Sequence, residues 1–264
     1  MIPTRDMTPC VPITPEEIAE QVLEVAGLGV SMVHLHARDP DSGEPTYKKE
    51  VYGEIISRIR HENKELILCV STSGRNHSDF EKRSECLELD GALRPDFASL
   101  TLSSLNFNKQ ASINTPETIQ LLAKKMSERG IRPELEAFDL GMINYARYLT
   151  SKGLLYPPHY FNVILGNIAC AQADIFHLGL MIRELPEGSV WSVGGVGDDQ
   201  LKMNIMSILS GGGVRVGLED NIWYDAERTK LATNRELVER IISIAEGLGF
   251  RPYTPQEARK VLCL

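Results

Sequence analysis

Residues 30–39 read Val-Ser-Met-Val-His-Leu-His-Ala-Arg-Asp, an apolar stretch that becomes polar at its end. Apolar and β-branched residues followed by turn residues are typical of a buried strand. Six more stretches of this kind follow, and consecutive stretches start 24 to 36 residues apart. That interval accommodates a helix and two loops, the connection that parallel strands need. The six are Leu66–Gly74, Phe97–Asn106, Pro133–Leu140, Tyr160–Gly166, Ser189–Gly197 and Gly213–Asp220.

The segments between these stretches have helix signals. Thr14, Pro15 and Glu17 supply an N-cap, a proline in the first helical turn and a capping-box glutamate, and Gly27 can end that helix. Further helices are predicted from apolar stripes or from Thr-Pro starts. These lie at Val51–Ile59, Thr115–Glu117, Leu201–Leu209 and Thr254–Glu257.

Alternating strands and helices predict an α/β fold, and we interpret residues 1–264 as a single domain. Seven strand–helix units are one fewer than in a (β/α)₈ TIM barrel. The chain passes from loop-like residues directly into a helix, so we expect a TIM barrel whose first strand is truncated at the N-terminus. A doubly wound open sheet is the alternative, but the GxGxxG that usually follows its first strand is missing.

Composition excludes several classes of protein. Acidic residues outnumber basic ones by 36 to 28, giving a net charge of −8, so we expect no nucleic-acid partner. No apolar run approaches the ~20 residues of a membrane span, and the start has no apolar signal segment, so we expect no membrane partner. An odd number of scattered cysteines favours a reduced, cytoplasmic chain. They are Cys10, Cys69, Cys86, Cys170 and Cys263.

The pair His34 and His36 is the sharpest local signal of chemistry. On a strand, residues i and i+2 point to the same face, roughly 6.6 Å apart. Two imidazoles there can bind one divalent metal ion, and they lie near the C-terminal strand end, where barrel active sites are found. The alternative is a hydrogen-bonded pair in a polar barrel mouth.

A third metal ligand is expected at the end of the last predicted strand. Glu219 and Asp220 lie there, and successive strand residues face opposite sides, so one acid can bind metal while the other faces the cleft. Arg215 lies four residues before Glu219 and would share its strand face. An arginine beside a carboxylate can hold an anionic intermediate, although a purely structural ion pair of Arg215 with Asp220 is the alternative.

Other strand ends also carry polar groups. Ser71 belongs to a hydroxyl-rich turn, Ser99 and Thr101 alternate on one strand face, and Glu134 and Glu136 share another. A glutamate in a parallel strand is costly unless it is paired, which makes Glu136 a candidate substrate-binding residue. A single buried hydroxyl is often merely hydrogen-bonded within the core. The recurrence of polar groups at one strand end after another is what predicts a site.

The sequence resembles the β-keto acid cleavage enzymes over nearly its whole length. The resemblance is carried by VPITPEEIAE, VHLHARDPDSGEPTY, VSTSGRN, ASLTLSSLNF, PELEAFDLGMI, GGGVRVGLEDN and LATNRELVER. It implies a (β/α)₈ barrel that assembles as a homotetramer, binds Zn²⁺ and converts a β-keto acid and acetyl-CoA into acetoacetate and a new acyl-CoA.

The resemblance also implies roles for individual residues. His34, His36 and Glu219 would bind zinc. Asp220 would be the general base and Arg215 its partner. The positions of Ser71, Ser99 and Glu136 resemble those that contact substrate.

Two departures from the family pattern bear on the ligands. Ile2 stands where relatives that bind an amino-substituted keto acid have glutamate, so we expect a neutral or apolar substrate side chain. Asp198 stands where the family usually has arginine, which would weaken a coenzyme contact nearby.

Three other functions are alternatives to β-keto acid cleavage. A metal hydrolase of the amidohydrolase type fits poorly, because it needs further histidines at later strand ends. A metal-dependent aldolase or lyase without coenzyme A remains an alternative, separated by acetyl-CoA dependence. A non-catalytic barrel that binds metal and ligand is the other.

Overall fold

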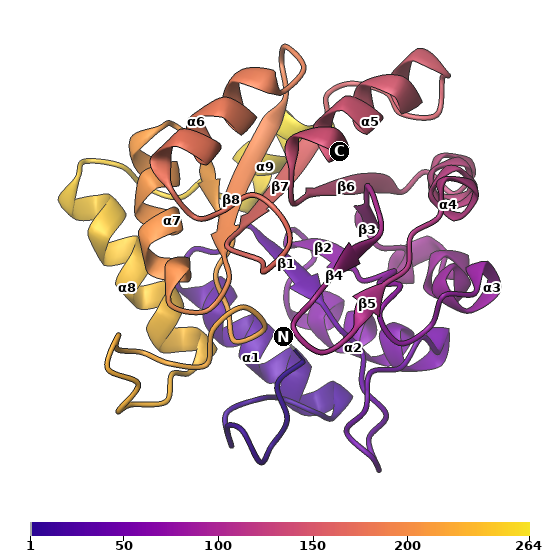
Figure 1. The fold of residues 1–264 in the computed structure, drawn as a ribbon. Coiled ribbons are helices and arrows are strands. Elements are labelled where there is room, and N and C mark those ends of the chain that lie inside the picture. Colours follow the sequence, from indigo (N-terminus) through magenta and orange to yellow (C-terminus); the bar gives the residue numbers. More distant parts are fainter. Residues whose placement is uncertain (1) are drawn as a thin grey trace.

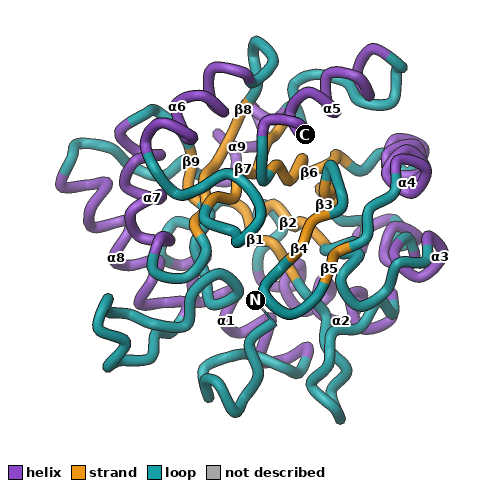
Figure 2. Tube along the Cα trace, in the orientation of Figure 1, coloured by secondary structure: helices purple, strands orange, loops and turns teal. Residues whose placement is uncertain are grey.

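A sheet of seven parallel strands forms the centre of the computed structural model, which describes residues 2–264. The strands lie in the order β1-β2-β3-β6-β7-β8-β9, and helices surround them (Figure 1 and Figure 2). Each starts within two residues of its predicted start, and the α/β barrel architecture is confirmed. The strands are β1 (Met32–Leu35), β2 (Ile67–Val70), β3 (Phe97–Thr101), β6 (Arg132–Ala137), β7 (Tyr160–Leu165), β8 (Val190–Gly195) and β9 (Gly213–Val214).

The helices begin where the sequence carries caps. Thr14 and Glu17 form the predicted capping box at the start of α1, and Thr254 forms another with Glu257 at α9. The helices are α1 (Pro15–Gly27), α2 (Lys49–Glu62), α3 (Phe80–Arg83), α4 (Pro116–Glu128), α5 (Leu140–Ser151), α6 (Ile175–Glu184), α7 (Asp199–Leu209), α8 (Asn234–Gly247) and α9 (Pro255–Leu262). Short 3₁₀ helices η1 (Glu85–Glu88) and η2 (Gly91–Leu93) follow α3, and a hairpin of β4 (Leu105–Asn106) and β5 (Ala111–Ser112) precedes α4.

The space inside the ring changes from apolar to polar along the strands. At the N-terminal strand ends, Ile67 and Phe97 pack with Ala258 and Leu262 of α9, which closes this end. From the middle of the strands toward their C-terminal ends the inward positions become polar, beginning with the buried Glu134 of β6. The main hydrophobic core lies outside the ring, between the sheet and helices α1 to α7. The inward-facing polar groups therefore gather toward one end of the barrel.

The sheet does not close between its two outer strands, β1 and β9. Within residues 2–264, no backbone hydrogen-bond ladder joins them, and residues 2–14 contain no strand. We call this boundary the seam. A cavity of about 940 Å³ is lined by β1 on one side and β9 on the other, with apolar side chains from α1 and α8.

None of the helices described for residues 2–264 has the length and apolar character that crossing a membrane requires.

Candidate active site

Two histidines and a glutamate meet at the C-terminal mouth of the seam. His34 lies in β1 and His36 directly follows it, with ring centroids 4.9 Å apart. Nitrogen atoms of both rings and a carboxylate oxygen of Glu219 all lie within 4.8 Å of one another. The structure thus brings together the three residues expected to bind metal, although Glu219 is 183 residues beyond His36.

Glu219 reaches this position by a turn and not on a strand. The prediction of a strand through Asp220 is wrong, because β9 ends at Val214. The carbonyl of Gly217 accepts a hydrogen bond from the Asp220 amide at 3.2 Å, so the chain turns back. Arg215 and Glu219 therefore do not share a strand face. Their ion pair forms because the turn brings Glu219 Oε2 to 2.6 Å from Arg215 Nη2.

Arg215 joins the acids at the end of β9. Its Nε donates to Asp220 Oδ2 at 2.8 Å, and its Nη2 donates to Asp220 Oδ1 at 3.3 Å. Burial disfavours its charge, but the Asp220 and Glu219 carboxylates outweigh burial and hold the pKa of Arg215 well above its usual value. The guanidinium is thus a fixed cation that orients both acids.

Glu219 is held as a carboxylate. Burial alone would raise its pKa, but His36 and Arg215 outweigh this and hold the pKa well below its usual value. His36 Nε2 lies 3.1 Å from Glu219 Oε1. An ionised carboxylate beside two imidazoles is what a divalent cation requires of its ligands.

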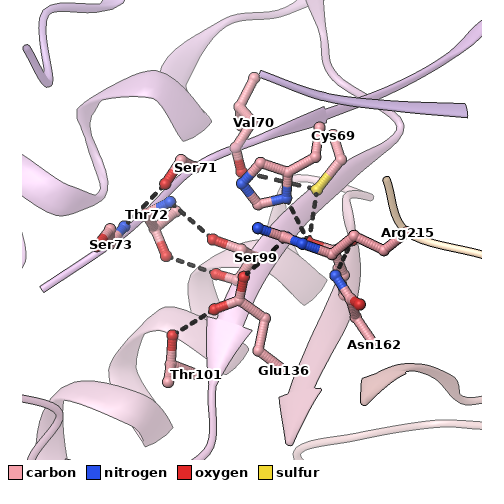
Figure 3. Close-up of polar contacts among 12 residues, drawn as sticks. Cys69, Val70, Ser71, Thr72, Ser73, Ser99, Thr101, Glu136, Asn162 and Arg215 are labelled. Atoms are coloured by element: carbon pink, nitrogen blue, oxygen red, sulfur yellow. Dashed lines mark hydrogen bonds and ion pairs between the residues drawn. The ribbon is translucent and has the colours of Figure 1, made fainter. Parts of the chain in front are cut away.

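The predicted substrate-binding residues lie at two depths. Ser71 lines the cavity, whereas Ser99, Thr101 and Glu136 are not among its described lining residues. Thr101 Oγ1 donates to Glu136 Oε2 at 2.6 Å, and Ser99 Oγ accepts from the Thr72 amide at 3.0 Å (Figure 3). These buried groups hold the lining residues in place. Burial raises the pKa of Glu136.

Glu136 also connects to the arginine. Its Oε1 lies 3.8 Å from Arg215 Nη1, and Figure 3 shows the two side chains approaching each other inside the ring. Polar groups on β3 and β6 are thereby linked to the acids that follow β9.

Two site residues were not singled out from the sequence. Glu134 Oε2 lies at hydrogen-bond distance, 2.7 Å, from His34 Nδ1. Like Glu136, Glu134 is a glutamate in a parallel strand, but only Glu136 was predicted from this feature to bind substrate. Arg75 donates to Glu219 Oε1 at 3.3 Å, and its guanidinium lies 4.3 Å from the ring centroid of Phe107. Arg75 lies in an irregular loop, where no periodicity could identify it.

The residues present fit a divalent metal ion. His36 Nε2 is buried and points at Glu219 Oε1, 3.1 Å away, so a nitrogen lone pair and a carboxylate oxygen lie side by side where an ion could bind both. Two imidazoles and one glutamate are the protein ligands of many catalytic zinc sites that keep a position open for substrate.

Comparison with known proteins gives a consistent result across the whole chain. A family model described as beta-keto acid cleavage enzyme matches residues 1–264. A 3-keto-5-aminohexanoate cleavage enzyme from Fusobacterium nucleatum is 38% identical over 262 residues, covering 99% of this chain and 93% of the relative. A 3-oxoadipate:acetyl-CoA acetyltransferase from Cupriavidus necator is 32% identical, covering 100% of this chain and 91% of the relative.

A third relative and a solved structure extend the comparison. The 3-dehydrocarnitine:acetyl-CoA trimethylamine transferase of Rhizobium meliloti is 31% identical, covering 96% of this chain and 90% of the relative. The apo structure of ObcA superposes with a TM-score of 0.88 at 22% identity, covering 97% of this chain. This chain spans 66% of the ObcA chain, and the likeness supports the barrel fold.

Proposed function

This chain belongs to the β-keto acid cleavage enzyme family, and we propose that it exchanges acyl groups between a β-keto acid and acetyl-CoA. The acetyl carbon bonds to the carbon next to the keto acid's carboxylate, and its own bond to the coenzyme A sulfur breaks. The bond from that carbon to the keto carbon breaks, and the released acyl group leaves on the coenzyme A sulfur. The products are acetoacetate and a new acyl-CoA.

One observation carries this proposal. The His34, His36 and Glu219 donor atoms lie within 4.8 Å of one another, and Arg215 and Asp220 lie directly beside them. A cation site next to a carboxylate held by arginine suits a reaction that removes a proton next to a carbonyl group. We propose Zn²⁺ as the ion, because a set of two histidines and one glutamate is typical of catalytic zinc. When bound there, Zn²⁺ would act as a Lewis acid toward the oxygens of the keto acid.

Asp220 is the proposed general base. Its carboxylate is 5% exposed, and the Arg215 guanidinium fixes both of its oxygens. It would take the proton from the carbon between the keto and carboxylate groups, and return it to the same carbon after the bond to the original keto carbon has broken. A positioned base of this kind contributes ~10²–10⁴-fold to the rate.

The remaining polar residues are proposed to bind and orient the keto acid. Ser71 lines the cavity and would hydrogen-bond the substrate directly. Ser99, Thr101 and Glu136 lie behind it. We propose that Ser99 acts on the substrate through Thr72, and that Thr101 holds Glu136, which acts through Arg215.

We further propose that the substrate carries a neutral or apolar side chain. Ile2 and Pro3 line the same cavity as the histidines, and an isoleucine there cannot pair with an ammonium group. Asp198, where the resemblance leads one to expect arginine, is paired instead with Arg228 at 2.9 Å. We therefore propose that this position contributes no positive charge to coenzyme binding.

A panel of β-keto acids with acetyl-CoA tests the function, with acetoacetate as the readout. We expect acetoacetate only when both substrates are present. Cleavage that does not depend on acetyl-CoA would instead identify a metal-dependent lyase. Metal and ligand binding with no turnover of any keto acid would identify a binding protein.

We also propose a homotetramer in the cytoplasm. The loop after β7 and the start of α6 expose Ile168, Ile175 and Phe176 by 65%, 72% and 75%, a surface that suits contact between subunits. All five cysteines are free thiols, which suits a reducing compartment. Light scattering on the purified protein measures the subunit number.

A further inference from the structure

Glu134 lies in the middle of the barrel interior and is 2% exposed. Donors from three other strands converge on its carboxylate. His34 Nδ1 of β1 lies 2.7 Å from Oε2, Cys69 Sγ of β2 donates to Oε2 at 3.4 Å, and Asn162 Nδ2 of β7 donates to Oε1 at 3.2 Å. A buried carboxylate with this many donors is fixed in place.

The bond to Glu134 decides which nitrogen of His34 is available to an ion. An ionised carboxylate only accepts hydrogen bonds, so Nδ1 of His34 must carry the proton. The neutral ring then presents Nε2 as its only lone pair. The contact also fixes the ring plane, because it reaches His34 from the opposite side of the barrel, across the interior from β6.

We propose that Glu134 is a positioning residue for the metal centre, holding His34 so that Nε2 faces the ion. It does not bind the ion itself, and Cys69 and Asn162 in turn hold Glu134. This inference rests on the proposed role of His34 as a metal ligand. A histidine ligand whose other ring nitrogen donates to a carboxylate is oriented by it and donates more strongly to the metal.

A second cation site is the competing explanation. Donor atoms of His34, Cys69 and Glu134 also lie within 4.8 Å of one another. The distance of 2.7 Å between His34 Nδ1 and Glu134 Oε2 is that of a direct hydrogen bond. Two tetrahedral ligands of one zinc, each about 2.0–2.1 Å from it, would be about 3.3 Å apart. The geometry therefore favours a proton between these atoms.

Metal affinity measured without substrate tests the proposal. Zn²⁺ is titrated against a chromophoric chelator for the wild type, Glu134→Ala and Glu134→Gln, and the absorption spectrum with Co²⁺ reports the ligand geometry. We expect Glu134→Ala to bind Zn²⁺ 10- to 100-fold more weakly, with an altered Co²⁺ spectrum. Glu134→Gln should lose less, because its amide oxygen still accepts from His34 Nδ1.

Glu134→Gln is expected to fold, because its neighbour can adapt. Asn162 Oδ1 has no hydrogen-bond partner among the described atoms. Rotating the Asn162 amide would therefore offer an acceptor to the new glutamine NH₂. Ser192→Ala is the matched control, since Ser192 is a buried polar residue of the same interior that bonds Tyr160 and not His34. It should leave the Zn²⁺ affinity unchanged.

The outcomes separate this inference from the proposed reaction. One Zn²⁺ per chain in every variant, with the affinity falling at Glu134→Ala, supports the positioning role. Unchanged affinity in Glu134→Ala, or a stoichiometry that falls from two ions to one, overturns it. A wild type that binds Zn²⁺ through a Glu134-dependent site but forms no acetoacetate would refute the proposed reaction and leave the positioning role standing.

Discussion

The two sides of the barrel are held together differently. On one side, β3, β6, β7 and β8 form what we call the paired wall, where β3 aligns five residues with β6 and β7 aligns six with β8. On the other side, β9 aligns only two residues with β8, and nothing described pairs it with β1. The proposed metal ligands and the base all belong to the seam side, whereas the wall supplies the buried groups behind them. The side chains proposed to carry out the chemistry thus lie at the seam, where side-chain contacts and not backbone hydrogen bonds join the two edges of the sheet.

Of the changes considered, metal removal should alter the seam side most strongly relative to the paired wall. The proposed ligands come from both sides of the seam, so a bound ion would link β1 to the turn after β9. We expect chelation to abolish acetoacetate formation and to speed amide exchange in residues 32–36 and 213–220, leaving β7 and β8 unchanged. Hydrogen-exchange mass spectrometry with and without Zn²⁺ measures this. Uniform protection in both states would show that the seam is closed without the ion.

Asp220→Asn should have the next largest effect. It removes the proposed base while keeping a side chain of the same size beside Arg215. Turnover should fall ~10²–10⁴-fold with the Zn²⁺ content retained. Steady-state kinetics and metal analysis on one preparation test this, and unchanged turnover in a zinc-loaded variant would reject the assignment.

Thr101→Val tests the paired wall. The substitution removes the donor at 2.6 Å from Glu136 Oε2 and leaves that buried oxygen without this bond. We expect unfolding in urea to become easier by about 1–3 kcal/mol. Thr150→Val is a suitable comparison, because the hydroxyl of Thr150 lies on α5 outside the ring. Equal losses in both variants would argue against a special role for the wall.

Ile2→Glu tests the substrate side chain at the mouth of the seam. A carboxylate there should favour an ammonium-bearing β-keto acid over a neutral one by about tenfold in relative kcat/KM, equivalent to about 1.4 kcal/mol. Ile2→Gln is the uncharged control. A wild-type protein that already prefers the ammonium-bearing acid would contradict the role given to Ile2.

The smallest effect is expected at α1, outside the barrel. Hydrogen bonding from Arg5 lowers the pKa of Glu17 to about 2. A carboxylate whose pKa is lower in the folded state stabilises the fold at pH values above its pKa in the unfolded chain, near 4.5. This stabilisation is lost as the pH falls toward 2. Both side chains are partly exposed, so water screening limits the contribution to below about 1 kcal/mol.

Arg5→Ala should therefore be slightly less stable than the wild type at pH 6, and the difference should vanish near pH 2. Urea unfolding across this range measures it. A difference that persists at the acid end would mean that Arg5 acts through packing and not through charge.

The strands could be predicted because their signal is local. A run of apolar residues such as Leu66–Val70 marks a strand wherever it lies in the fold. The end of β9 could not be predicted in this way, because Val216 and Leu218 continue the alternating apolar pattern although the chain turns between Gly217 and Asp220. The four-residue spacing of Arg215 and Glu219 predicted a shared strand face, whereas the two side chains meet because the chain turns after β9.

The contact between Glu134 and His34 could not be predicted from any local sequence pattern. The two residues are 100 positions apart and meet only because the ring brings β6 opposite β1. The unusual cost of a glutamate in a parallel strand identified the type of residue that matters, and Glu134 has the same signal as Glu136. Only the fold tells which of the two reaches the histidine.

The position of the proposed metal ligands on either side of the seam has a consequence for biosynthesis. His34 and His36 are translated about 180 residues before Glu219. At ~5–20 residues per second, the two imidazoles wait on the order of ten seconds or longer for their third partner. The complete proposed metal site would therefore form late in translation, when the last third of the polypeptide packs against the first third.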